Sequence, residues 1–501
     1  MKKNIYNILF GILLVFLFLQ MIQERLKLNV RPLYGVTYKT EFPKLELESI
    51  SNGKYQAQLE KYISENFGFR EIAIRWYNQY VWTFFHKTYN KSFLKGKENW
   101  FYYYAGHKEY KGTRYIDIFK TKEKAIENYE KNIAMMCQLR DILKEYNIEF
   151  MTFMAPDKSF IYPEYLPDTS RSKSPLRAIE YYDLRFAEEG FPNIEMTKWF
   201  ATMRDTLSHP VMHTIDSHWG ISSVYGCDSL LRYLNTLNNF GIPKVKYGQA
   251  VRTNKKPTWD EKVLNLLFPV INKNYNYKLD ITVDTNENTK KPRILFVGDS
   301  FIWSITDHMP LKDILSDIEI WYYNSTVHNG FNLEKTKKEN INSLKSILKS
   351  DYVVFYSCGH QWHKVTYNFL EETLADFGVT NNTTNHDREK VRRTLIEIDI
   401  ENDKEWNDKL KNYSINNNLS LEDVYKMEVE NILNNNILIK DSINLNKDAI
   451  FNYEVEKLIQ KWKNNPSMMD YLKKKAIKKD QPLEQVIIDD AQWYIRKHGS
   501  Q

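Results

Sequence analysis

The chain has 501 residues, of which 42% are hydrophobic and 14% aromatic, and its net charge is +6. This length exceeds one ordinary core and indicates two or three domains, while only 17 Gly and 15 Pro exclude a collagen-like or long low-complexity chain. The charge is a mild bias without a basic stripe or nucleic-acid motif, so a polynucleotide partner is not indicated. The cysteines Cys137, Cys227 and Cys358 form neither a disulfide framework nor a metal-binding motif.

Residues 1–25 are predicted to be a signal anchor, a single transmembrane helix. Lys2 and Lys3 precede an apolar run from Ile8 to Leu19, and no small-residue cleavage site follows it. A cleaved signal peptide is the alternative. The two lysines predict a cytoplasmic N-terminus, so the rest of the chain is expected outside the cytoplasm, on the periplasmic side of the inner membrane.

Residues 26–130 are expected to form a linker and an N-terminal helical part. The stretch 26–54 is polar and has the composition of a linker, and a helical pattern runs from Tyr55 towards Trp82 and Phe85. A second helix is predicted over 122–146, where apolar residues recur at spacings of three and four.

Residues 131–375 are predicted to form an α/β domain. Strands are expected at 148–154, 293–297 and 351–356, where short apolar runs follow or precede helical patterns. Helices are expected between them, and the first has Ser174 as N-cap and Pro175 at its first position. The expected helices are Ser174–Glu188, Ile221–Leu237 and Leu333–Lys349. This alternation favours a mostly parallel sheet with helices on both faces.

Residues 376–501 are predicted to be a helical module with a two-fold internal repeat. The two copies match at a constant offset of about 62 residues, with Leu410 aligned to Leu472 and Val424 to Val486. Each copy reads as two helices around a turn that begins at Asn418 or Asp480.

The sharpest local feature is a predicted strand that ends in Gly298-Asp-Ser300-Phe. Ligands bind at the carboxyl ends of strands in open α/β sheets. Gly298 allows a tight turn there, and the Ser300 backbone N–H would face a developing oxyanion. A serine nucleophile needs a base, and Asp216-Ser-His218 places a carboxylate and an imidazole on the same side of an extended segment.

The order Asp216-Ser-His218-Trp219 and then a strand ending in Gly-Asp-Ser-Phe resembles the alginate O-acetyltransferase family of SGNH-hydrolase-like proteins. That family has the reverse motif order of ordinary SGNH hydrolases. Three further segments resemble the family's FPFR, GxxGWLFY and PDKxxVYPE motifs, and the similarity covers roughly 55–375. They are Asn66-Phe-Gly-Phe-Arg70, Gly96-Lys-Glu-Asn-Trp100-Phe-Tyr and Pro156-Asp-Lys158-Ser-Phe-Ile-Tyr162-Pro-Glu.

The resemblance implies a flavodoxin-like, SGNH-hydrolase-like fold with permuted motif order. It also implies Asp216, His218 and Ser300 as orienting acid, general base and nucleophile. The reaction it implies is acyl transfer through an acetyl-serine to a hydroxyl of an exported polysaccharide, with a membrane-bound O-acyltransferase as donor partner. No cofactor or metal is implied.

Several residues are weaker candidates for binding the oxyanion or substrate. Asn324 and Asn329 are candidate oxyanion donors, beside Gly298, and Trp219 is a candidate pocket residue. The family often has an arginine after the last strand, where this chain has Cys358-Gly-His360-Gln361, so His360 and Gln361 are candidate ligands in its place. His209, His213 and His218 fit no usual zinc spacing.

Two other functions stay open from the sequence. A carbohydrate esterase would use the same triad with water as acceptor. A non-catalytic polysaccharide-binding or assembly subunit would keep the fold. The altered 358–361 segment is compatible with this alternative.

Overall fold

The computed structural model describes residues 2–26, 30–35, 40–253, 260–270, 275–285, 289–364, 366–379, 387–434 and 447–498. The side chains of Lys2 and Lys3, on which the predicted orientation depends, lie outside this part. The chain divides into two compact units, one essentially Met1–Asp376 and the other from Phe377 onward.

The first unit is built on a seven-stranded sheet with the order β12-β11-β10-β9-β13-β3-β4. The five strands from β10 to β4 are parallel to their neighbours, whereas β11 and β12 add antiparallel at one edge. The strands are β3 (Glu149–Ala155), β4 (Asn193–Glu195), β9 (Arg293–Gly298), β10 (Asp317–Tyr322), β11 (Thr326–Asn329), β12 (Glu334–Lys337) and β13 (Tyr352–Cys358). The expected mostly parallel sheet is therefore present, and its three predicted strands are β3, β9 and β13.

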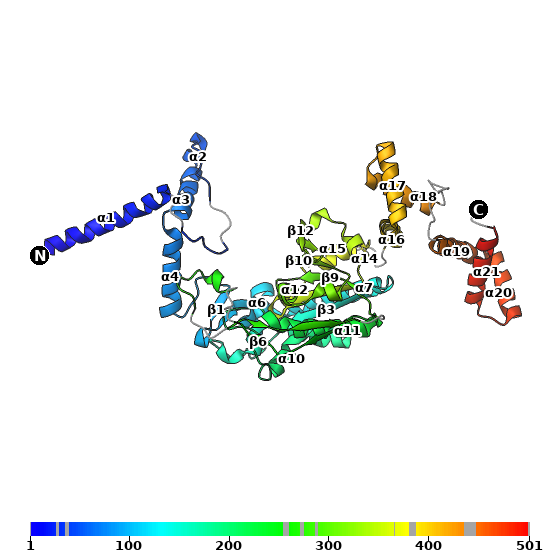
Figure 1. The fold of residues 1–501 in the computed structure, drawn as a ribbon, viewed down its shortest axis with the longest axis horizontal. Coiled ribbons are helices and arrows are strands. Elements are labelled where there is room, and N and C mark those ends of the chain that lie inside the picture. Colours follow the sequence, from blue (N-terminus) through cyan, green and yellow to red (C-terminus); the bar gives the residue numbers. More distant parts are fainter. Residues whose placement is uncertain are drawn as a thin grey trace. The chain divides into compact units, whose positions relative to one another are not determined.

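Helices cover both faces of this sheet, with α7 and α15 on one side and α10 and α11 on the other (Figure 1). Side chains alternate between the two sides along each strand. On β3, Phe150 packs against Phe369 of α15, while Phe153 packs against Trp219 and stacks on Tyr356. The covering helices are α7 (Lys122–Lys144), α9 (Ala178–Glu188), α10 (Met196–Met203), α11 (Ser223–Asn238), α12 (Ile302–His308), α13 (Leu311–Ile314), α14 (Ser343–Leu348) and α15 (Phe369–Asp376).

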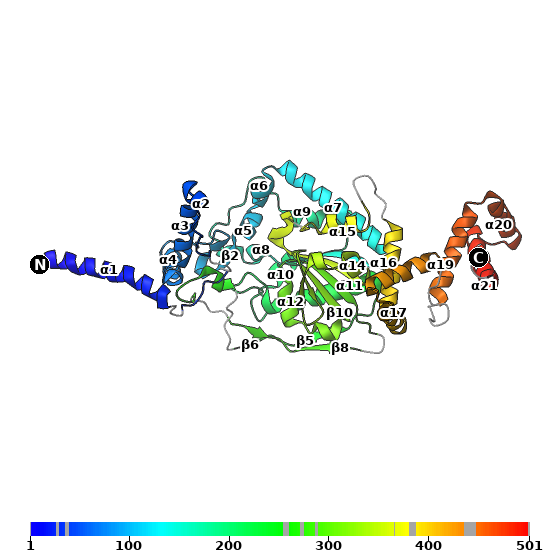
Figure 2. The same cartoon turned by 90° about the horizontal axis from the view of Figure 1, so that it is seen from above.

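Residues 93–119 pack into this same core, although the sequence placed them in a separate N-terminal part. A hairpin of β1 (Phe93–Lys95) and β2 (Phe101–Tyr103) contributes Tyr102 to the main core, and Trp100 beside it stacks on Tyr165. Two helices follow, α5 (Tyr104–Lys111) and α6 (Arg114–Phe119). Short elements surround the sheet, and Figure 2 shows β5, β6 and β8 along one edge of the unit. They are η1 (Lys97–Asn99), α8 (Lys158–Ile161), η2 (Pro163–Tyr165), η3 (Gly220–Ser222), β5 (Lys244–Tyr247), β6 (Val251–Arg252), η4 (Asp260–Leu264), β7 (Tyr277–Lys278), β8 (Ile281–Asp284), η5 (Lys338–Asn340) and η6 (Gly359–Lys364).

Three predicted helices differ from the observed ones. The helix expected from Tyr55 is two helices, α3 (Lys54–Asn66) and α4 (Arg70–Phe84), because Phe69 adopts a left-handed φ of 57° between them. The helix expected from Ser174 begins at Ala178, and the Ser174 hydroxyl accepts a hydrogen bond from Lys122 instead of capping it. The helix expected over 333–349 is the edge strand β12 followed by η5 and the short α14.

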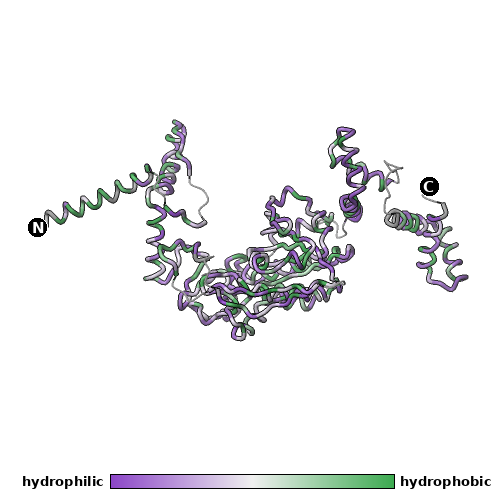
Figure 3. The backbone as a smooth tube through the Cα atoms, viewed as in Figure 1, coloured by the Kyte–Doolittle hydropathy of each residue, from purple (hydrophilic) through white to green (hydrophobic). Residues whose placement is uncertain are grey.

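The N-terminal segment forms α1 (Lys2–Leu26), and α2 (Leu47–Ser51) precedes α3. Apolar side chains such as Ile8, Leu13 and Phe18 are exposed on α1. Figure 3 shows the hydrophobic character of this helix in the colour of the tube. Within the residues that the structure describes, none of the helices combines the length and the hydropathy needed to span a bilayer.

The second unit contains two groups of three helices. The first group is α16 (Arg388–Asn402), α17 (Lys404–Asn417) and α18 (Leu421–Leu433), and the second is α19 (Lys447–Lys463), α20 (Pro466–Lys479) and α21 (Leu483–His498). Each has its own apolar core. The aligned pairs Leu410 and Leu472, and Val424 and Val486, are all buried. Each copy therefore has a third helix, at its start, that the pattern did not predict.

The turns of the two copies also correspond. Asn418 and Asp480 both end a helix in the left-handed conformation, with φ of 53° and 51°. Asp403 and Asn465 both cap the helix before that turn with their side chains.

Candidate active site

Ser300 lies two residues beyond the end of β9, in the middle of the parallel part of the sheet. Gly298 is paired with Tyr356 of β13, and a Cβ on Gly298 would lie 1.6 Å from the Tyr356 carbonyl oxygen. The glycine is therefore required for the close approach of two strands. This differs from the predicted role in a tight turn, and Gly298 has no side chain to offer a substrate. The following helix, α12, starts at Ile302 and not at Ser300.

The buried carboxylate of Asp299 fixes the conformation of the segment that carries Ser300. One oxygen accepts a hydrogen bond from the backbone N–H of Phe301 at 3.0 Å. The other accepts from the backbone N–H of Cys358 at 2.8 Å and from the Ser357 hydroxyl at 3.0 Å. Asp299 thus ties the nucleophile segment to the end of β13, a role that the sequence analysis did not assign.

The structure brings together the three residues predicted to form a triad. The Nε2 atom of His218 lies 2.9 Å from Ser300 Oγ, and its Nδ1 lies 3.2 Å from Asp216 Oδ1. The same Asp216 oxygen accepts the backbone N–H of His218 at 2.9 Å. Asp216 is buried, and about a fifth of the His218 side chain is exposed. This is the arrangement in which a carboxylate orients an imidazole towards a hydroxyl.

The loop that carries Asp216 is held by the buried ammonium of Lys158. Its Nζ donates hydrogen bonds to the carbonyl oxygens of Phe101 at 2.7 Å, His213 at 2.6 Å, Thr214 at 2.8 Å and Asp216 at 2.8 Å. The ammonium also lies 5.0 Å from the ring centroid of Trp100. A charge buried in this way needs such partners, and through them Lys158 connects β2 to the loop of the triad.

Tyr323 is a further neighbour of Ser300 that the sequence analysis missed. It follows β10 with a left-handed φ of 48°, and its phenol lies close enough to the Ser300 side chain to influence the pKa of the phenol. Burial raises the pKa of this phenol above its ordinary value, so it stays a neutral hydroxyl. It is therefore a candidate donor to an oxygen that reacts at Ser300.

The two asparagines predicted as oxyanion donors lie in different surroundings. The Asn324 amide donates to a Glu372 carboxylate oxygen at 2.8 Å and to the Tyr367 carbonyl at 3.1 Å, so it is already engaged. Asn329 ends β11, where it pairs with Glu319 on the antiparallel side of the sheet. The amide of Asn324 is thus taken up by other partners, whereas the role of Asn329 stays a prediction.

Trp219 packs inside the core and does not line an open pocket. It is 1% exposed, its indole N–H donates to the Phe301 carbonyl at 3.2 Å, and its ring fills the space beside Gly226. The structure therefore corrects its predicted role as a substrate-binding residue: Trp219 supports the residue that follows Ser300.

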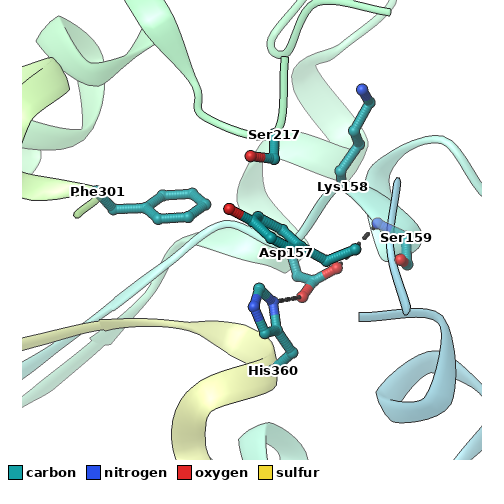
Figure 4. A pocket seen from close by; sticks show the side chains of 7 residues that line it. Asp157, Lys158, Ser159, Ser217, Phe301 and His360 are labelled. Carbon is teal, nitrogen blue, oxygen red and sulfur yellow. Dashed lines mark hydrogen bonds and ion pairs between the residues drawn. The ribbon is translucent and has the colours of Figure 1, made fainter. Parts of the chain in front are cut away.

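His360 lines a small pocket beside these residues, together with Asp157, Tyr103, Ser217 and Phe301 (Figure 4). Its Nδ1 lies 2.8 Å from Asp157 Oδ2, and both side chains are buried. Gln361, the other candidate from this segment, is not one of the residues that line the pocket.

His209 and His213 lie near the triad loop but point to other partners. His209 Nε2 is 3.3 Å from the Ser222 hydroxyl, and the His213 ring lies parallel to that of Tyr277. Burial lowers the pKa of each imidazole to about 4. Among the described residues, no three His, Cys, Asp or Glu side chains are grouped so that they could hold a metal ion.

Asp157, Lys158 and Tyr323 were not predicted as site residues, and they differ in whether the sequence could have indicated them. Asp157 and Lys158 stand in a segment that already resembled a family motif, directly after a predicted strand, so a role in the site could have been assigned to them. Tyr323 could not have been found in this way, because β10 was not predicted.

Part of the chain is similar to a known protein family. Residues 93–225 match the family model described as SGNH hydrolase-like domain, acetyltransferase AlgX. This match includes Asp216 and His218 but ends before Ser300. No curated protein matches the chain.

Solved structures with a similar arrangement come from three bacteria. The O-acetyltransferase domain of Pseudomonas putida AlgJ is 12% identical, with 60% of this chain and 98% of that chain covered and a TM-score of 0.36. Pseudomonas aeruginosa AlgX is 12% identical over 56% of this chain and 67% of that one, with a TM-score of 0.31. Bacillus cereus PatB1 is also 12% identical, with 47% of this chain and 90% of that chain covered and a TM-score of 0.30. Residues 93–225 are therefore similar to the SGNH hydrolase-like domain that this acetyltransferase family model describes.

Proposed function

We propose that this chain is an O-acetyltransferase that forms an acyl-serine at Ser300 and passes the acyl group to a hydroxyl of a polysaccharide. The observation that carries the proposal is the unbroken hydrogen-bonded series from Asp216 through His218 to Ser300. The family match at residues 93–225 supports an acetyltransferase. The polysaccharide acceptor rests on the resemblance of the sequence motifs to the alginate O-acetyltransferase family.

In the first half-reaction, His218 Nε2 takes the proton from Ser300 Oγ as that oxygen attacks the acyl carbonyl carbon. Asp216 accepts the Nδ1–H of His218, which fixes the tautomer and stabilises the imidazolium. The bond between the acyl carbon and the donor oxygen breaks, and the leaving oxygen receives the proton from His218. The Tyr323 phenol, a neutral hydroxyl near Ser300, is the candidate donor to the oxygen that becomes negative at this centre.

In the second half-reaction, the acceptor hydroxyl gives its proton to His218 and attacks the acyl carbon of acyl-Ser300. The bond from that carbon to Ser300 Oγ breaks, and Oγ recovers a proton from His218. The acceptor leaves as an ester, and the free serine is restored.

We also propose an extracytoplasmic site for this reaction, with the N-terminal segment as an inner-membrane anchor and a membrane-bound O-acyltransferase as donor partner. The support is the apolar run from Ile8 to Leu19 after two lysines and the exposed apolar side chains of α1. Protease added to intact spheroplasts is expected to degrade the catalytic domain. Full protection of the domain would contradict this location.

Transfer of an acetyl group to a sugar is the direct test of the function. The full-length protein is incubated with an activated acetyl ester and a panel of oligosaccharides, and the sugars are analysed by mass spectrometry. We expect acetylated sugar with the parent protein and none with Ser300→Ala. Release of acetate from acetylated polymers, with no acetylated sugar from any acceptor, would favour an esterase instead.

A further inference from the structure

A second carboxylate–imidazole pair, Asp157 and His360, lies beside the triad and has no part in the reaction described so far. The Asp157 Oδ2 atom and His360 Nδ1 are 2.8 Å apart, and the two side chains are 3% and 7% exposed. The other Asp157 oxygen accepts the backbone N–H of Ser159 at 2.9 Å, which fixes the carboxylate. The pair therefore has a defined geometry within the protein.

The register of the sheet explains why this pair stands next to Ser300. Gly298 of β9 pairs with Tyr356 of β13, and Ala155 of β3 pairs with Cys358 of β13. Each of these three central parallel strands is followed, within two residues of its end, by one of the residues in question: Ser300, His360 and Asp157. Carboxyl ends of neighbouring parallel strands form the edge at which ligands bind in open α/β sheets.

The pocket that Asp157 and His360 line also touches the segments that carry the triad residues. Two other lining residues, Ser217 and Phe301, are sequence neighbours of His218 and Ser300. The ring of Phe301 also packs against the imidazole of His218, with 4.9 Å between ring centroids. Figure 4 shows Phe301 and Ser217 on one side of the pocket and the imidazole of His360, turned to Asp157, on the other.

The hydrogen bonding of His360 determines what this pocket can bind. A carboxylate can only accept, so Nδ1 of His360 donates to Asp157, and the tautomer that carries this proton has Nε2 as an acceptor. The Cys358 sulfur lies 3.6 Å from both ring nitrogens, which is a weak contact. A hydroxyl group is a better donor to Nε2 than this thiol.

The walls of the pocket suit a hydroxyl on a sugar carbon. Tyr103 and Phe301 supply aromatic rings, and the Tyr103 ring lies 5.1 Å from that of His360. Aromatic rings offer an apolar surface to C–H groups while a polar group beside them takes the hydroxyl.

The geometry points to a subsite in which His360, oriented by Asp157, accepts a hydrogen bond from a hydroxyl of the acceptor sugar next to the one that is acylated. This inference rests on the proposed transferase function. His218 remains the base for the reacting hydroxyl, and His360 binds its neighbour, so the subsite selects acceptors with adjacent hydroxyl groups. Asp157 is a positioning residue that acts through His360.

The test separates formation of acyl-Ser300 from use of the acceptor. His360→Gln, Asp157→Asn and the control Gln361→Ala are compared with the parent as full-length proteins, each at a temperature well below its own Tm. Gln361 belongs to the same short helix η6 but does not line the pocket. The rate of acetyl adduct formation from an activated ester is measured by mass spectrometry, and the KM for an oligosaccharide acceptor is measured separately.

We expect His360→Gln and Asp157→Asn to raise the acceptor KM by about tenfold or more while adduct formation changes by less than about threefold. Gln361→Ala should leave both values near those of the parent. An acceptor of matched size that lacks the adjacent hydroxyl should bind the parent and His360→Gln equally. An unchanged acceptor KM in His360→Gln, or an equal loss in adduct formation, would overturn the subsite. Absence of any adduct in the parent would instead overturn the proposed function, and the subsite with it.

Discussion

His218 and Ser300 are 82 residues apart in sequence, and the Nε2 atom of one lies 2.9 Å from the Oγ atom of the other. The separation is bridged by the fold, because Ser300 follows the central strand β9 while His218 belongs to the loop that precedes η3 and α11. Lys158 holds the loop that carries Asp216 and His218, and Asp299 holds the segment that carries Ser300. The position of Ser300 relative to His218 therefore depends on residues that do not touch the serine.

The first prediction concerns the two residues that activate the serine. His218→Ala should reduce the rate of adduct formation about as much as Ser300→Ala, because residues that act as one unit are not additive. Asp216→Asn should fold and reduce that rate by about a hundredfold or more, since the amide no longer favours the required tautomer of His218. Stopped-flow measurement with an activated acetyl ester gives both values. Nearly full activity of His218→Ala would show that another base serves Ser300.

The second prediction concerns Lys158, which the structure makes a positioning residue for the triad loop. Lys158→Met removes one donor from each of four carbonyl oxygens. The Thr214 and His213 oxygens keep a backbone donor, and a buried polar group left unpaired costs roughly 1–3 kcal/mol. We expect a lower Tm and, well below that Tm, at least a tenfold loss in the maximal rate of adduct formation with little change in the KM for the ester.

A matched control for this variant is Lys97→Met, in which an exposed lysine of the neighbouring β1–β2 connection is replaced. Lys97 donates to the Glu164 carbonyl at 3.1 Å and does not contact the triad loop. Its replacement should leave the rate unchanged. A Lys158→Met protein that is folded and fully active would contradict the role assigned to Lys158.

The sequence predicts those parts of this site that stand in a short motif or a continuous apolar run. Ser300 and the Asp216–His218 pair could be predicted because each stands in a short motif, and β3, β9 and β13 could be predicted because their apolar runs are continuous. The strand β10 alternates the charged Asp317 and Glu319 with apolar residues, so it has no continuous apolar run and was missed. As a result Tyr323, which follows β10, was missed as well.

Contacts between residues far apart in sequence explain why Asn324 and Trp219 differ from their predicted roles. Asn324 is a reasonable oxyanion donor by position, but Glu372 and Tyr367, which lie more than 40 residues away, engage its amide. Trp219 stands beside the catalytic histidine in sequence, yet packing against Phe153 and Gly226 buries it. The repeat after residue 376 was detectable because its buried positions recur, whereas the first helix of each copy has fewer matching residues.

The third prediction concerns the pH dependence of stability. Burial lowers the pKa of His209 and His213 from 6.5 to about 4 in the folded chain. At pH values between about 4 and 6.5, the unfolded chain binds more protons than the folded chain. The free energy of unfolding should therefore fall as the pH is lowered from about 6.5 towards 4. The loss is at most about 3 kcal/mol for each imidazole.

Urea unfolding at pH 7.5 and pH 5 measures this effect. His213→Asn should reduce the difference in unfolding free energy between the two pH values, although it also lowers stability at pH 7.5 by leaving a buried space. His86→Asn, which replaces an exposed imidazole, should leave the difference unchanged. An equal pH dependence in the parent and His213→Asn would contradict the assignment.

The central claim is that Ser300 carries the acyl group, and the most direct measurement is the mass of the protein after reaction with an activated acetyl ester, followed by peptide mapping. We predict one acetyl group on the peptide that contains Ser300, slow loss of that group in water, and no adduct in Ser300→Ala. Asp216→Asn should form the same adduct more slowly. An acetyl group found on another residue, or an adduct that persists in Ser300→Ala, would contradict the account.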